Sequence, residues 1–128
     1  MKRGVLIAIL VCAVVLCVGV GVYLWTDARP VQSFSLADYS DQLSDFASDR
    51  VTPPVSSPKE ARERAEEIWT EIYGDRVQQQ KPYHVFYDRD AGVWLVKGHF
   101  PLLSGLKGGV AYLLITDGGD VLAVWHTK

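Results

Sequence analysis

The stretch GVAYLLITDGGDVLAVWH, residues 109–126, decides the fold of this chain. Two apolar runs rich in β-branched residues flank Asp117-Gly118-Gly119-Asp120. Asp and Gly tolerate the backbone angles of a tight turn, so this pattern predicts a β-hairpin. With a two-residue loop at Gly118-Gly119, Tyr112 faces Trp125 and Ile115 faces Leu122.

This hairpin separates an aliphatic face from an aromatic one. The aliphatic face is the better core face, and the aromatic face is either an uncovered recognition patch or a second core covered by residues that precede the domain. The sequence leaves both alternatives open. The predicted core face consists of Ala111, Leu113, Ile115, Leu122 and Val124, and the opposite face of Tyr112, Leu114, Thr116, Val121 and Trp125.

A second hairpin and one helix complete the predicted domain. Residues 83–87 and 93–99 form strands around the turn at residues 88–92. Ser57-Pro58-Lys59-Glu60 predicts a capped helix start, and Gly74 predicts its end. The helix must cover the sheet, because two hairpins alone are marginally stable. We therefore predict an α+β domain over residues 57–128, with the helix packed on a four-stranded antiparallel sheet through Ala61, Ala65, Ile68, Trp69 and Ile72.

An apolar block at residues 4–25 contains no charged residue. As a helix it is about 33 Å long, which is enough to cross a hydrocarbon core of about 30 Å. Lys2 and Arg3 precede it, which predicts a cytoplasmic N-terminus at residues 1–3. We expect a single-pass signal anchor in the inner cell membrane, with the following domain outside the cytoplasm. A cleaved signal peptide is the alternative.

The apolar block contains a stripe of small residues and both cysteines of the chain. Ala13, Cys17 and Gly21 are spaced four residues apart, so two such helices would pack closely and allow a homodimer. Cys12 is the other cysteine, so disulfides cannot stabilise the predicted domain.

Residues 26–56 are rich in Ser, Asp and Pro, which indicates a spacer. A short helix is predicted within it at residues 36–47. Its apolar stripe either lies on the domain or belongs to a flexible tether or partner-binding segment. The stripe consists of Leu36, Tyr39, Leu43 and Phe46.

No residue pattern in the chain specifies a reaction, a cofactor or a metal site. His84, His99 and His126 have no ligand-like spacing, and no cysteine lies near them in sequence. The net charge of −2 and the acidic spacer disfavour binding to nucleic acid.

Several short motifs follow one another in a characteristic order along residues 57–128. They include Ile72-Tyr73-Gly74, Lys81-Pro82-Tyr83, Trp94–Gly98 and Gly108–Tyr112. In this order the chain resembles the nuclear transport factor 2 fold immunity protein family of bacteria. The resemblance implies a reduced form of that fold and a non-enzymatic protein-binding module that neutralises a cognate toxin. A structural or accessory subunit of a cell-envelope complex is the alternative.

The predicted partner-binding residues lie on the aromatic face and in the glycine-rich connection before the last hairpin. Aromatic side chains offer rigid contact area, and exposed loops are common contact sites. The candidates are Lys107, Gly108, Gly109, Tyr112, Trp125 and His126.

Overall fold

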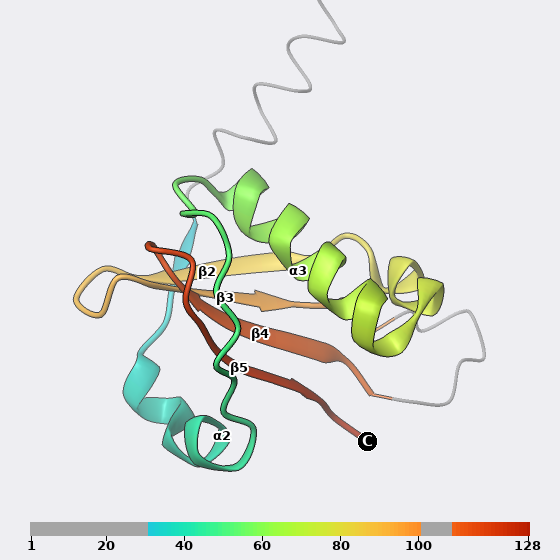
Figure 1. Ribbon diagram of the computed structural model, residues 1–128, viewed down its shortest axis with the longest axis horizontal. Helices are drawn as coiled ribbons and strands as arrows, with labels where there is room; N and C mark the ends of the chain where they lie inside the picture. Colours follow the sequence, from blue (N-terminus) through green and yellow to red (C-terminus); the bar gives the residue numbers. More distant parts are fainter. Residues whose placement is uncertain (1–30, 101–108) are drawn as a thin grey trace, which may run out of the picture. The chain divides into compact units, whose positions relative to one another are not determined.

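The computed structural model describes residues 31–100 and 109–128, which form a sheet with helices on both faces (Figure 1). The strand order is β1-β2-β3-β4-β5. The elements are β1 (Gln32–Ser33), η1 (Leu36–Tyr39), α2 (Ser40–Asp45), α3 (Pro58–Tyr73), η2 (Asp75–Gln80), β2 (His84–Asp88), β3 (Val93–Lys97), β4 (Ala111–Thr116) and β5 (Val121–His126).

The two predicted hairpins are confirmed, but the strand count was wrong. β2–β3 and β4–β5 pair antiparallel, and β3 joins them by pairing with β4. The fifth strand, β1, comes from the predicted spacer and runs parallel to β2, with Gln32 opposite Phe86. The sheet is therefore mixed. Two consecutive polar residues show no alternation of apolar and polar residues, so β1 leaves no local signal in the sequence.

The register of the last hairpin is as predicted for Tyr112, Leu113 and Leu114 and differs nearer the turn. Tyr112 faces Trp125, as expected, but Ile115 faces Val121 rather than Leu122. The loop has three residues instead of two, because the Thr116 amide donates to the Asp120 carbonyl at 2.9 Å. Three-residue hairpin loops commonly end with a glycine at positive φ, and Gly119 has φ 93°.

A bulge on β5 returns the pairs from Leu114 back to Tyr112 to the predicted register. It also changes which residues face the core. The register shifts between Leu114 and Ile115. As a result Val121 is buried in the core beneath α3, whereas Leu122 packs in the core on the opposite face. A bulge places two consecutive residues opposite one partner, so the strict alternation assumed for this strand was wrong.

Helix α3 begins and ends where the sequence predicts. Ser57 Oγ accepts a hydrogen bond from the Glu60 amide at 3.2 Å, and Gly74 follows the last turn with φ 82°. The Glu60 carboxylate accepts from the Ser56 amide at 2.7 Å, so the expected capping box closes one residue early. Figure 1 shows α3 across one face of the sheet, where its Ala61, Ala65, Ile68 and Trp69 are buried.

The opposite face of the sheet is covered by the residues before α3. The helix predicted at residues 36–47 is divided into η1 and α2, which lie on the other side of the sheet from α3 in Figure 1. Residues 31–128 form a compact unit. This second core contains Val93, Leu95, Leu114, Ala123 and Trp125, packed against Phe34, Leu36, Tyr39 and Leu43.

The outer edge of β5 is occupied by residues 46–55, here called the edge segment. The Val121 amide donates to the Arg50 carbonyl at 2.9 Å, and the Thr52 amide donates to the Gly119 carbonyl at 2.8 Å. Further bonds join Ser48 to Leu122 and Val55 to Asp117. The edge segment therefore hydrogen-bonds along β5 as an irregular strand would.

Several predictions fall outside the described residues. They are the cytoplasmic residues 1–3, the membrane anchor at residues 4–25, and the small-residue stripe of Ala13, Cys17 and Gly21. Within residues 31–100 and 109–128, no helix has the length and apolar character needed to span a membrane.

Candidate partner-binding surface

The aromatic face of the last hairpin is covered, so the prediction of an open recognition patch there is corrected. Trp125 is only 6% exposed. Its ring stacks on Tyr112, with ring centroids 4.9 Å apart, and lies near Phe46 at 6.3 Å and Tyr39 at 5.9 Å. The alternative of a second core is therefore what the structure shows.

Tyr112 is partly buried and combines two roles. Its carbonyl accepts a hydrogen bond from the buried Trp69 indole at 3.3 Å. Its ring lies 5.6 Å from the Lys97 Nζ, within the range of a cation–π contact. Tyr112 thus links the two cores. Trp69 belongs to the core between α3 and the sheet, and the Tyr112 ring packs on the other face.

Gly109 has a structural reason to be glycine. A Cβ atom at this position would lie 1.5 Å from the Thr127 carbonyl oxygen. Val110 and Thr127 hold the segment before β4 against the segment after β5, because the Thr127 amide donates to the Val110 carbonyl at 3.0 Å. The other two residues predicted in this connection, Lys107 and Gly108, lie outside the described residues.

His126 is exposed at the end of β5, beside the last residue of α3. The His126 and Tyr73 rings are 5.4 Å apart, and burial raises the pKa of the Tyr73 hydroxyl. Ile72 was predicted as a core residue, yet it is 48% exposed. The core contacts of α3 end at Trp69, so the last turn of the helix leaves Ile72 in solvent.

Three exposed apolar residues belong to segments at this end of the sheet. Ile72, Tyr73 and Phe100 are among the five large hydrophobic residues found exposed in the described chain. Figure 1 shows that the end of α3, the end of β3, the start of β4 and the end of β5 lie at the same end of the sheet. We call Ile72, Tyr73, Phe100, Gly109 and His126 the sheet-end surface.

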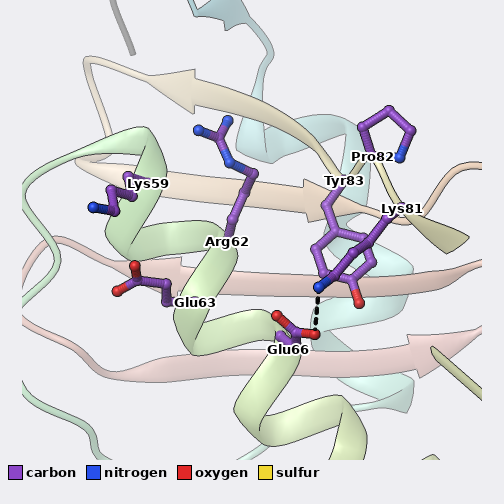
Figure 2. A pocket seen from close by; sticks show the side chains of 7 residues that line it. All are labelled: Lys59, Arg62, Glu63, Glu66, Lys81, Pro82 and Tyr83. Carbon is purple, nitrogen blue, oxygen red and sulfur yellow. Dashed lines mark ion pairs between the residues drawn. The ribbon is translucent and has the colours of Figure 1, made fainter. Parts of the chain in front are cut away.

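A shallow groove of about 520 Å³ lies between α3 and the chain that enters β2 (Figure 2). The Lys81 ammonium pairs with Glu66 at 2.8 Å and lies 5.9 Å from the centre of the Tyr83 ring. Desolvation and the Glu66 charge raise the pKa of Tyr83 to about 12, and its hydroxyl donates to the Val77 carbonyl. The groove is lined by Lys59, Arg62, Glu63, Glu66, Lys81, Pro82 and Tyr83.

The groove is suited to binding rather than to acid–base chemistry. Tyr83 stays protonated at neutral pH, and the Glu66 carboxylate is already paired with Lys81. No sequence pattern predicted this groove, because its lining comes from α3 and from the connection after η2, which are separated along the chain.

The structure brings together two histidines that their sequence positions keep apart. His84 Nε2 lies 3.2 Å from His99 Nδ1, and both side chains are exposed. In the described ranges, no group of three or more His, Cys, Asp or Glu side chains is arranged to hold a metal ion.

Comparison with protein families finds a match for more than half of the chain. The model for "NTF2 fold immunity protein" matches residues 60–128, which include most of α3 and all of β2–β5. Searches of curated proteins and of solved structures found no match to the chain.

Proposed function

This chain belongs to the NTF2 fold immunity protein family, and from that membership we propose that it binds a bacterial toxin protein and neutralises it without catalysing a reaction. The family match over residues 60–128 is the observation that carries the proposal. Neutralisation by binding requires an accessible contact surface and a rigid scaffold. The sheet with covered faces supplies the scaffold.

We place the toxin contact at the sheet-end surface. Ile72, Tyr73 and Phe100 offer apolar contact area, and energetically dominant interface residues are often aromatic. Gly109 and His126 were predicted as contact residues from the sequence. They belong to the same end of the sheet, because Gly109 comes shortly before β4 and His126 is the last residue of β5. Lys107 belongs by sequence to the connection that joins Phe100 to Gly109, so it is included in the proposed contact.

We also propose that the protein is held in the inner membrane with its domain outside the cytoplasm. The support is the uncharged block at residues 4–25, preceded by Lys2 and Arg3. Protease added to intact spheroplasts is expected to digest the domain. If the domain is digested only after lysis, the proposed topology is wrong, while the toxin-binding proposal is unaffected.

Co-expression tests the toxin-binding proposal. The full chain is expressed in a sensitive bacterium together with a toxin domain encoded beside its gene. We expect growth to be rescued in proportion to the amount of the immunity protein, because a binder acts stoichiometrically. A stably expressed chain that neither rescues growth nor forms a complex with any neighbouring toxin would refute the proposal.

Variants locate the contact. Tyr73→Ala, His126→Ala and Lys107→Glu are each expected to weaken the complex while the melting temperature stays nearly unchanged, since surface substitutions rarely affect stability strongly. Asp41→Ala is the matched control, because Asp41 is exposed on α2 at the opposite face of the sheet. If Asp41→Ala weakens binding as much as the others, the contact has been placed at the wrong surface.

A further inference from the structure

His84 and His99 are brought together by the backbone of the sheet. His84 is the first residue of β2 and pairs with Lys97 on β3, and His99 follows two residues later. The His99 amide donates to the Gln80 carbonyl at 2.6 Å, and the Gly98 amide donates to the Ala111 carbonyl at 2.9 Å. Both imidazoles therefore extend from fixed backbone, which reduces the entropy lost when they bind one ligand together.

The spacing of the two ring nitrogens matches that of a chelate. His84 Nε2 and His99 Nδ1 are 3.2 Å apart. Two imidazole nitrogens bound to one tetrahedral zinc ion, each about 2.0–2.1 Å from the metal, are about 3.3 Å apart. Small rotations of the two exposed rings would direct both lone pairs at a common ion without separating the nitrogens.

We propose that His84 and His99 form a two-imidazole binding site for a divalent transition-metal ion of the Zn²⁺ or Cu²⁺ class. Imidazole nitrogens suit these ions, whereas Mg²⁺ and Ca²⁺ prefer oxygen ligands. The remaining coordination positions are open to water or to a donor atom from a bound protein. The site is independent of the proposed toxin binding.

The electrostatic surroundings act on the site in two opposing ways. Metal ligation requires the neutral form of histidine, and desolvation together with the nearby His99 and Lys97 lowers the pKa of His84. The positive charge of Lys97 also repels a bound cation. A hydrogen bond between the facing nitrogens requires a hydrogen on one of them, and that hydrogen must move to the far nitrogen of the same ring before both lone pairs can bind the ion.

Calorimetric titration of the purified full chain with Cu²⁺ tests the proposal. We expect one saturable site whose affinity falls by about tenfold or more in His84→Asn and in His99→Asn, because loss even of outer-shell groups costs about 10–100-fold. His126→Asn is the matched control and should bind Cu²⁺ as the natural chain does. No saturable binding at millimolar Cu²⁺, or equal binding by the natural chain and His84→Asn, overturns the proposal.

Lys97→Gln gives a result that misfolding cannot produce. Removing the positive charge opposite His84 should tighten Cu²⁺ binding by about two- to fivefold, the range expected for one exposed charge. Unchanged or weaker binding by a folded Lys97→Gln protein would place the ion away from the two histidines.

Discussion

Asp117 accepts a hydrogen bond from the indole nitrogen of Trp94 at 2.9 Å. Its second carboxylate oxygen accepts from the Tyr87 hydroxyl at 2.8 Å, which raises the pKa of Tyr87. The Asp117 side chain in the last hairpin turn therefore hydrogen-bonds to one residue of β2 and one residue of β3. The Val55 amide also donates to the Asp117 carbonyl, so the edge segment is attached at the same residue.

Asp117→Ala is expected to lower the free energy of unfolding by about 2–3 kcal/mol, because hydrogen bonds to a charged acceptor are stronger than ordinary ones and Trp94 is buried. Chemical denaturation of the natural and variant proteins measures the change. Asp120→Ala, in the same turn, is the control and should stay within about 0.5 kcal/mol. Similar losses for both variants would mean that the turn as a whole, rather than the Asp117 carboxylate, is responsible.

Trp69→Ala is expected to cost about 3–5 kcal/mol, the usual range for emptying a large aromatic core position. The Trp69 side chain is fully buried, packs edge-on against Tyr83, and donates its N–H to Tyr112. Ile72→Ala, three residues later on α3, should cost less than about 1 kcal/mol because Ile72 is half exposed. Thermal unfolding followed by circular dichroism checks both values. A large loss for Ile72→Ala would show that the last turn of α3 packs more closely than described.

The two glycines of the last turn should differ sharply in their tolerance of alanine. At Gly119 an added Cβ would lie 2.2 Å from the Thr52 carbonyl oxygen, and φ is positive. Gly119→Ala should therefore destabilise the protein by about 2 kcal/mol or more and speed amide exchange at Thr52 and Val121. A Cβ added at Gly118 would lie 3.7 Å from its nearest neighbour, the Thr116 hydroxyl oxygen, so Gly118→Ala should be tolerated. Equal effects of the two substitutions would contradict the close approach of the edge segment.

Asp88 is expected to make stability depend on acid pH. Hydrogen bonds from the amides of Leu36, Ala91 and Asp90 lower the pKa of its carboxyl below the ordinary value of 3.8. A carboxyl with a lowered folded-state pKa stabilises the fold above its unfolded pKa, and this contribution is lost as pH falls through the folded-state pKa. The difference in unfolding free energy between pH 7 and pH 3 should shrink in Asp88→Asn. An unchanged difference would assign the acid sensitivity to other carboxyls.

Local sequence signals account for the parts of the fold that were predicted correctly. The Ser57 cap, the Gly74 stop and the positions of the two hairpin turns, though not the length of the last loop, each depend on residues within a few positions of one another. The family was also identified from motifs within residues 57–128, and the match over 60–128 confirms it.

The features that were missed depend on contacts between distant residues. β1 has only two polar residues, and the bulge on β5 is compatible with the same apolar run as a regular strand. Whether Trp125 was exposed depended on where Tyr39 and Phe46 would pack, which no local pattern decides. His84 and His99 meet only because β2 and β3 pair in one particular register.

The edge segment and β1 together determine the shortest fragment of this protein in which both edges of the sheet are paired. Both precede residue 60, where the family match begins, yet one occupies the β5 edge and the other pairs with β2. A fragment that starts at residue 60 would present unpaired amides and carbonyls on both flanks of its sheet, an arrangement that recruits further strands. We expect such a fragment to retain the family motifs and still aggregate, so resistance to aggregation would be contributed by the chain outside the matched residues.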